Sequence, residues 1–180
     1  NSVVWSERSD YRELLKAEHL LLNERLGAIY GADVVGAGLK RVAVDSGHRA
    51  GILTHPYLLA LFSYHDSTSP IHRGVFLTRN VLGRMLKPPP QAVSFNDEKL
   101  DPQLTMREKI TLITSENACM SCHAVINPLG FSMENFDAIG RWRMSEKNKK
   151  INAKSDYMTA AGELLSFTGA RDVANFAVRS

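Results

Sequence analysis

The chain has 180 residues, of which 44% are hydrophobic and 23% charged, and its formal net charge at pH 7 is +3. This balance is typical of a globular protein, and the length fits one domain of ordinary size, or one domain plus extended flanks. It does not indicate nucleic-acid binding, because the charge excess is small and no dense basic run occurs. No stretch reaches the roughly 18–20 apolar residues of a membrane helix. The start contains neither a methionine nor an apolar signal core, as in a processed chain or an excised fragment.

The first predicted element is a helix over residues 10–30. Apolar residues recur there at three- and four-residue steps, and Gly31 is a plausible stop. A glycine-rich stretch follows, with a short strand predicted over residues 40–44. A second helix is expected over residues 56–64, with Pro56 in its first turn.

Ser69 and Pro70 have the pattern of an N-cap followed by a first-turn proline, which predicts a helix over residues 71–86. The run Pro88-Pro89-Pro90 ends that helix, and an extended surface loop is expected up to about residue 102.

Thr105 and Glu108 form a capping-box pattern, which predicts a helix from Met106 to about Thr114. The lysine-rich stretch 147–150 is expected to be a solvated loop. Short strands and turns are expected over residues 151–167, and a last helix over residues 169–178. The predicted fold class is therefore mainly α, with a helical N-terminal extension and a small irregular or β C-terminal segment.

The sequence Cys119-Met-Ser-Cys122-His123 contains both cysteines of the chain. Two intervening residues let both sulfurs reach the two vinyl groups of a porphyrin from one helical turn, and the adjacent imidazole then faces the iron. The motif predicts one covalent haem c, with Cys119 and Cys122 as anchors and His123 as proximal ligand. A zinc site is disfavoured because no further ligands lie at suitable spacing. A thioredoxin-like site is disfavoured because a helix, not a strand, precedes the motif.

The residues after the motif are candidates for the haem environment. Phe131 and Phe136 are expected to wall the porphyrin, although ordinary core packing is the alternative for each. The Pro128 carbonyl is the expected acceptor for the His123 Nδ1 proton. Arg141 is a candidate partner for a haem propionate, as are Arg73, Arg79 and Arg143, with surface ion pairs as the alternative.

The pieces TSPIHRG, CHAVINPLGF and ENFDAIGRWR resemble the planctomycete-type cytochrome-c-like proteins, whose C-terminal part is a series of domains of unknown function. The resemblance covers nearly the whole chain. It implies a cytochrome-c-like helical haem domain, exported across the inner membrane, that forms the C-terminal part of a longer protein. It divides the chain into the helical end of a preceding domain (1–36), a helical segment with a proline-rich loop (37–103), and a haem-binding segment with a C-terminal cap (104–180). Relatives commonly carry Leu in place of Met133 and often Asp in place of Asn127 and Asn152.

The sixth iron ligand is left open by the sequence. His55 is the first candidate, because imidazole binds iron strongly and the surrounding residues are apolar. His72 and Met133 follow, and the departure from the family at Met133 weakens it as a family-wide ligand. A site without a sixth protein ligand is a further alternative.

The expected function is electron transfer by a one-haem module. Its partner would be a redox protein or other domains or subunits of a larger complex. One alternative is a haem enzyme that activates peroxide or oxygen at an open sixth position, and another is a haem-stabilised interaction module. Because haem c is attached outside the cytoplasm, a periplasmic or equivalent location is expected.

Overall fold

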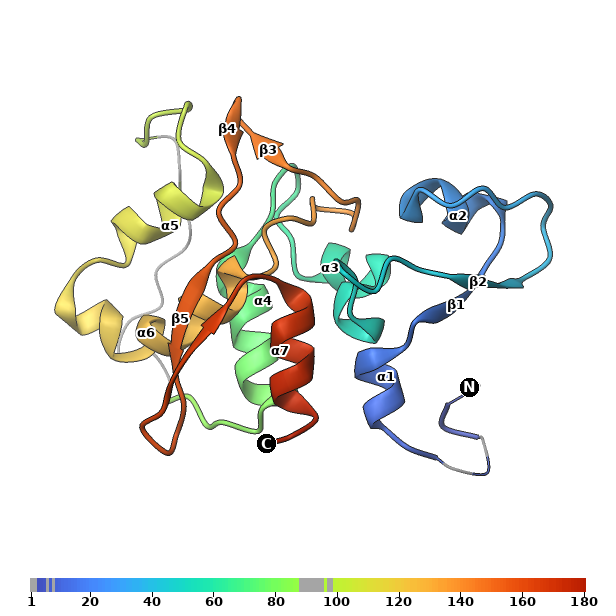
Figure 1. Cartoon of the computed structure of the whole chain (residues 1–180). Helices are drawn as coiled ribbons and strands as arrows, with labels where there is room; N and C mark the ends of the chain where they lie inside the picture. The colour runs from blue at the N-terminus through green and yellow to red at the C-terminus, as the bar shows by residue number, and fades with distance from the viewer. Residues whose placement is uncertain (1–2, 6, 8, 88–95, 97–98) are drawn as a thin grey trace.

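The structure, a computed structural model, describes residues 3–5, 7, 9–87, 96 and 99–180. Its centre is built around two helices that cross, α4 (Pro70–Phe76) and α6 (Asn117–Phe131). In Figure 1, α7 (Ala170–Ala177) lies in front of α4, and an N-terminal arm extends to the right of the central elements. The loop expected after Pro88-Pro89-Pro90 lies largely outside the described residues.

The arm contains two short helices and an antiparallel pair of strands, so the prediction of one helix over residues 10–30 was wrong. Its elements are α1 (Arg12–Lys16), β1 (His19–Leu22), α2 (Glu24–Tyr30) and β2 (Lys40–Ala43). The chain leaves helical geometry at Ala17, and Asn23 then caps a new helix because its side chain accepts a hydrogen bond from Leu26 N. The predicted stop at Gly31 (φ 68°) and the strand over residues 40–44 are confirmed.

In the middle of the chain, two helices begin at Pro56 and Pro70, as the sequence predicted. Its elements are η1 (Gly51–Thr54), α3 (Pro56–Leu61), α4 and the π-helical turn η2 (Leu77–Val81). Ser69 caps α4, since its hydroxyl accepts a hydrogen bond from His72 N at 3.3 Å. The helix expected over residues 71–86 ends early, because the backbone widens in η2 and then turns at Gly83 (φ 63°).

The capping box at the start of α5 (Met106–Ile113) is confirmed. Glu108 N donates to the Thr105 hydroxyl at 3.3 Å, and Thr105 N donates to the Glu108 carboxylate at 2.7 Å. The chain then turns over a few residues and enters α6, the longest helix of the described chain.

The C-terminal region forms two antiparallel hairpins and a last helix. Its strands are β3 (Ser145–Glu146), β4 (Lys149–Lys150), β5 (Ser155–Met158) and β6 (Leu164–Phe167), followed by α7. The predicted strands within residues 151–167 and the helix over 169–178 are therefore confirmed. The stretch 147–150 is a hairpin end and not a plain loop, because Lys147 and Asn148 adopt positive φ values of 51° and 60°.

The fold class is mixed α and β, so the prediction of a mainly α, cytochrome-c-like helical domain was wrong. Helices account for 39% of the described residues and strands for 14%, and the strands form three small two-stranded sheets. The sheets arise where short apolar or turn-flanked segments pair with a neighbour in sequence instead of extending a helix.

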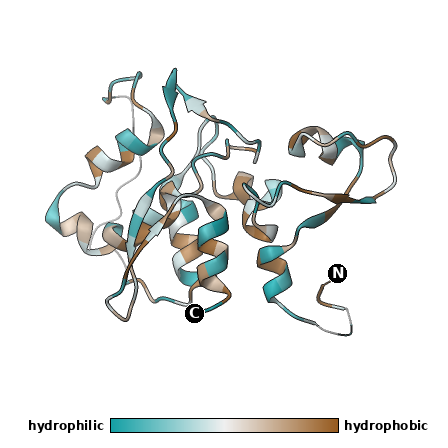
Figure 2. Ribbon diagram, viewed as in Figure 1, coloured by the Kyte–Doolittle hydropathy of each residue, from teal (hydrophilic) through white to brown (hydrophobic). Residues whose placement is uncertain are grey.

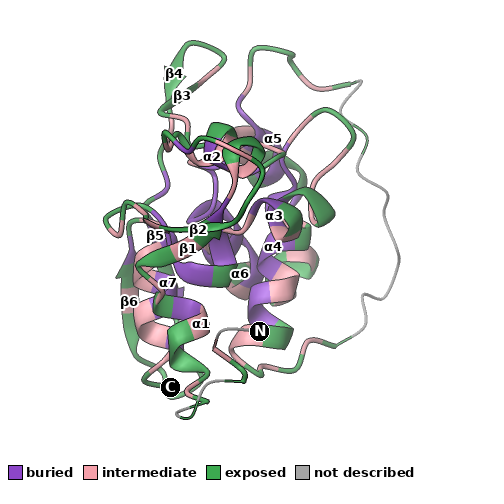
Figure 3. Cartoon of the chain, turned by 90° about the vertical axis from the view of Figure 1, so that its right-hand side faces the viewer, coloured by how far each residue is buried: buried purple, intermediate pink, exposed green. Residues whose placement is uncertain are grey.

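The core lies where α6 meets α4. A Cβ added to Gly74 would lie 2.2 Å from Ile126 O, and one added to Gly130 would lie 2.0 Å from Pro70 O, so the two backbones touch at both ends of the crossing. Figure 3 shows most buried residues in this central region, while the arm is mainly exposed or intermediate. Figure 2 shows hydrophobic and hydrophilic residues alternating around α7, whose buried residues include Val173 and Ala174.

Candidate functional site

The cysteine motif occupies the first half of α6. Cys122 and His123 follow Cys119 by three and four positions, so the three side chains share one face of the helix. All three residues are half-buried, and neither thiol forms a disulfide. Every fully buried residue of α6 lies in its second half. The motif is therefore presented on the part of the helix that the protein itself covers least.

His123 is held by a chain of hydrogen bonds that leads into the core. Its Nδ1 lies 2.9 Å from Asn127 Oδ1, and Asn127 Nδ2 donates to the Thr114 hydroxyl at 2.9 Å. Thr114 in turn donates to Ile110 O at 2.7 Å. Asn127 is one helical turn after His123, and Thr114 lies just beyond the end of α5.

The last acceptor fixes the direction of this chain. The Ile110 carbonyl can only accept, so the Thr114 proton points to it and the Thr114 oxygen receives the Asn127 NH₂ group. The amide oxygen of Asn127 then faces His123 and also only accepts, which requires the proton on Nδ1. His123 Nε2 therefore carries the free lone pair that a metal ligand needs.

Pro128 does not take the role predicted for it. Its carbonyl accepts a hydrogen bond from Ser132 N at 3.2 Å, as expected inside a helix, because helical carbonyls point along the axis. A side chain four residues after His123 lies on the same helical face, and for this reason Asn127 is the partner. The sequence carried this signal in the spacing of His123 and Asn127, but it was not recognised.

The two aromatic residues expected to wall the porphyrin are packed in the protein interior. Phe131 is 6% exposed and packs with Met106 and Ile110, and the Arg107 guanidinium lies 4.5 Å from its ring centroid. Phe136 is fully buried in the main core, where its ring meets Trp142 edge to face. Ordinary core packing, the alternative for both residues, describes these surroundings.

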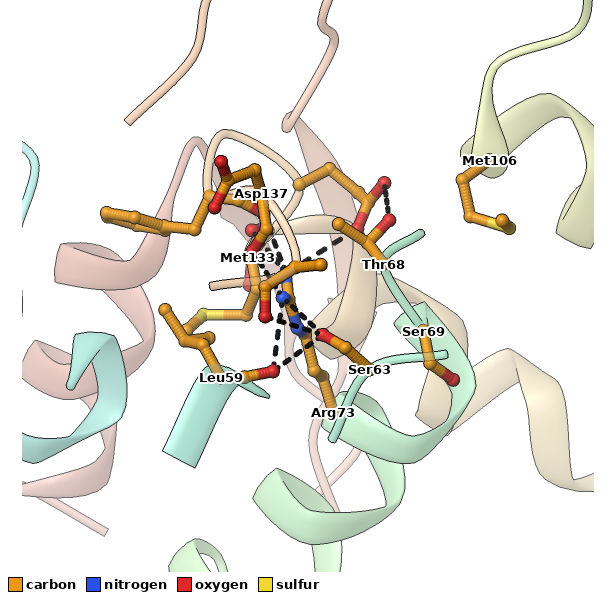
Figure 4. A network of polar contacts seen from close by, with 12 residues as sticks. Leu59, Ser63, Thr68, Ser69, Arg73, Met106, Met133 and Asp137 are labelled. Carbon is orange, nitrogen blue, oxygen red and sulfur yellow. Dashed lines mark hydrogen bonds and ion pairs between the residues drawn. The ribbon is translucent and has the colours of Figure 1, made fainter. Parts of the chain in front are cut away.

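Arg73 is directed into the protein and binds backbone oxygens. Its guanidinium donates to four carbonyls, those of Leu59, Met133, Phe136 and Asp137, and to the Ser63 hydroxyl. Figure 4 shows the guanidinium enclosed by these groups, which come from α3, from the segment after it and from the turn after α6. Its role is thus to tie α4 to two other segments.

Glu134 lies at the centre of the same network. The Thr68 hydroxyl and Arg143 Nη2 donate to its Oε2, at 2.9 and 3.3 Å, while its Oε1 has no hydrogen-bond partner. Burial raises the pKa of Glu134 to about 7, although Arg73 and Arg143 favour the charged form. Burial likewise lowers the pKa of Arg73, to about 10. The motifs TSPIHRG and ENFDAIGRWR therefore meet in one buried network, which sequence reasoning did not foresee.

Arg141 is exposed, on the turn that follows Glu134. The Asp137 side chain accepts hydrogen bonds from Ile139 N and Arg141 N at 2.9 and 2.8 Å, so this carboxylate braces the turn. Among the four arginines considered for a propionate, Arg141 and Arg79 are exposed, whereas Arg73 and Arg143 bind groups of the protein.

The candidate sixth ligands lie apart from His123. His55 caps α3, and its Nδ1 accepts a hydrogen bond from Tyr57 N at 3.2 Å. Figure 1 shows α3 and the first turns of α6 on opposite sides of α4. His55 instead lines a cleft of about 890 Å³ that is formed mainly by the arm, and burial lowers its pKa.

The other two candidates are also placed elsewhere. Met133 is 1% exposed within the main core. His72 is exposed near the start of α4, where its Nδ1 lies 2.9 Å from the Ser69 hydroxyl. The described residues thus bring Cys119, Cys122 and His123 together but leave His55, His72 and Met133 in separate surroundings.

Comparison with known families gives one match. Residues 49–146, just over half of the 180 residues, match PSCyt3, which is described as a protein of unknown function (DUF1588). The chain belongs to the PSCyt3 family. Since PSCyt3 is a planctomycete cytochrome-like family, the resemblance drawn from the sequence is confirmed at that level. No curated protein and no solved structure matches the chain.

The PSCyt3 match begins at Arg49, after the arm, and ends at Glu146 in β3. It therefore includes both the cysteine motif and the network of Arg73, Glu134 and Arg143. No helix in the described part of the chain is long and apolar enough to cross a membrane. Within the same residues, no group of three or more His, Cys, Asp or Glu side chains is arranged to hold a metal ion.

Proposed function

We propose that this PSCyt3 chain binds one haem c covalently and transfers electrons. The observation that carries the proposal is the state of His123, whose Nδ1 is bound to Asn127 so that Nε2 remains for iron. Two disulfide-free thiols share its helical face, at the spacing that haem attachment requires. These residues fit a porphyrin better than they fit a zinc ion, for which the motif supplies too few ligands.

The chain contributes anchoring and ligand orientation. Cys119 and Cys122 would hold the haem through thioether bonds, each formed by addition of the S–H bond across one vinyl double bond. His123 would supply a ring nitrogen to the iron, and Asn127 keeps that ring oriented. When bound, the haem supplies a one-electron couple between ferrous and ferric iron. The site lies on the least covered half of α6, which is favourable for exchange with a partner.

The proposal extends to location and partner. Haem c attachment needs reduced thiols outside the cytoplasm, so we place the chain in the periplasm or an equivalent compartment. The partner is a redox protein, or another domain or subunit of a larger complex.

Intact mass and a reduced-minus-oxidised optical spectrum of the purified chain test the proposal together. The chain should be produced in a host that attaches haem c. We expect a mass increase of one haem that survives denaturation, and the absorption bands of a c-type haem. The matched control replaces both cysteines (Cys119→Ala with Cys122→Ala) and should lose the covalent mass increase. A colourless protein with the mass of the bare polypeptide would refute the proposal.

A second candidate function is binding of small ligands or peroxide at five-coordinate iron. It is favoured by the separation of His55 from α6 across α4 and by the burial of Met133 in the core. High-spin spectra, carbon monoxide binding and peroxide turnover would support it. A six-coordinate, low-spin spectrum in both oxidation states would support electron transfer instead.

A further inference from the structure

We infer that Asn127 is the positioning residue that sets the tautomer and the donor strength of His123, and thereby the reduction potential of the haem. The inference rests on the proposed function and deepens it. Its starting point is the chain of directed hydrogen bonds from His123 through Asn127 and Thr114 to Ile110 O. An imidazole whose Nδ1 proton is held by an oxygen acceptor is oriented and is a stronger donor at Nε2.

The surroundings of Asn127 keep its amide in one orientation. Asn127, Thr114 and Ile110 are 7%, 4% and 0% exposed, so water does not compete for these hydrogen bonds. A flip of the amide would place its oxygen against the Thr114 oxygen, whose proton is already donated to Ile110 O. Two oxygens facing each other without a proton between them would be unfavourable in a buried site.

The chemical character of the acceptor follows from the same contacts. An amide oxygen is uncharged, so it accepts the Nδ1 proton without adding negative charge beside the ligand. A carboxylate in the same place would draw the proton more strongly and stabilise ferric iron. The neutral amide therefore holds the potential above the value that a carboxylate would give.

The test compares reduction potentials of haem-loaded variants of the 180-residue chain, each checked first by intact mass. Asn127→Asp should lower the midpoint potential, because the charged acceptor strengthens the ligand. Asn127→Leu should raise it, because the acceptor is removed. Thr114→Val should shift it in the same direction as Asn127→Leu and by less, since the amide loses its fixed orientation but remains. Asn175→Asp on α7 is the control for charge alone and should give a smaller negative shift than Asn127→Asp.

These results separate the inference from the proposed function. If the variants carry covalent haem but Asn127→Asp shifts the potential no more than Asn175→Asp, the inference is wrong and the haem proposal stands. If the wild-type chain attaches no haem, the haem proposal fails, and the tautomer is still measurable.

For that measurement, ¹⁵N NMR of the full chain with Cys119→Ala and Cys122→Ala reports which ring nitrogen of His123 is protonated at alkaline pH. We expect protonated Nδ1, and a shift toward protonated Nε2 when Asn127→Leu or Thr114→Val is added. Circular dichroism confirms that each variant is folded. Protonated Nε2 in the folded chain with Asn127 intact would overturn the inference.

Discussion

Arg73 and Glu134 form a buried ion pair in which Arg73 Nη1 and Glu134 Oε1 lie 3.9 Å apart, with side chains only 2% and 1% exposed. Removing two charges from water opposes folding, so such a pair contributes less to net stability than its Coulomb energy suggests. The loss of one partner is costly, because the other charge is left buried. The pair and the carbonyls around it fix the turn after α6 against α3 and α4.

Replacing the arginine, Arg73→Met, should lower the free energy of unfolding by about 3–5 kcal/mol. The variant removes the guanidinium donor from the backbone carbonyls of Leu59, Met133 and Phe136. It also leaves Glu134 with less compensating charge. Urea unfolding followed by circular dichroism measures the change. The exposed Arg79→Met should alter stability by no more than about 0.5 kcal/mol. Equal effects of the two substitutions would contradict the structural role of Arg73.

The raised pKa of Glu134 leads us to expect that the free energy of unfolding falls as the pH rises from weakly acidic to neutral. Burial raises its pKa from the ordinary 4.5 to about 7, so the folded protein holds a proton in this window that the unfolded chain has released. This contribution to the free energy of unfolding is fully present below the unfolded pKa and is lost as the pH rises through the folded pKa.

Glu134→Gln should remove this pH dependence, because the amide does not titrate. The measurement is the free energy of unfolding at a series of pH values from about 4 to 8, compared between wild type and variant. The exposed Glu163→Gln serves as the control and should retain the wild-type profile. A variant profile that still falls over the same window would show that another group is responsible.

The crossing of α4 and α6 predicts that Gly130→Ala is strongly destabilising. The added Cβ would lie 2.0 Å from Pro70 O, and this neighbour is backbone, which cannot move aside as a side chain can. The expected loss is at least about 1–3 kcal/mol in thermal or urea unfolding. Gly38→Ala, where no atom lies within 4 Å of the added Cβ, should be close to neutral. An unchanged stability for Gly130→Ala would contradict the contact.

The capping box predicts that Thr105→Ala lowers stability by about 1 kcal/mol, because Glu108 N loses its acceptor at the start of α5. The exposed Thr111→Ala within the same helix is the matched control, and alanine there should be neutral or slightly stabilising. The two variants are compared by urea unfolding. The same unfolding midpoint for both would show that the Thr105 cap does not stabilise the protein.

Local signals in the sequence predicted helix starts well and strand pairing poorly. The starts at Ser69 and Thr105 followed from side chains that bond to backbone groups within a few residues, and these contacts form in almost any tertiary setting. The sequence did not predict strand β1, because its leucines fit a helical repeat equally well. The segment is a strand because it pairs with β2.

Of the candidate site, the sequence predicted only the cysteine motif and its histidine. Cys119, Cys122 and His123 are adjacent in sequence, and their chemistry depends on spacing alone. The contact between Asn127 and Thr114 depends on how α5 and α6 are placed, and the contact between Arg73 and Glu134 joins distant segments. Arg73 was considered only as a partner for a propionate, because a sequence does not show which cationic side chains are buried. The contact with Glu134 was therefore not predicted.

Pro128 lies inside α6 and has no backbone N–H, so the hydrogen bond that would run to the Ala124 carbonyl is missing between the two halves of the helix. The close backbone contacts of α6 with α4 are at Ile126 and Gly130, on either side of Pro128 and both after the thiols. We expect any bending of α6 to be concentrated at this one turn, as is usual at a proline inside a helix. The side chain of Asn127 spans the same turn through its hydrogen bonds to His123 and Thr114, so we expect it to limit that bending as well as orient the ligand.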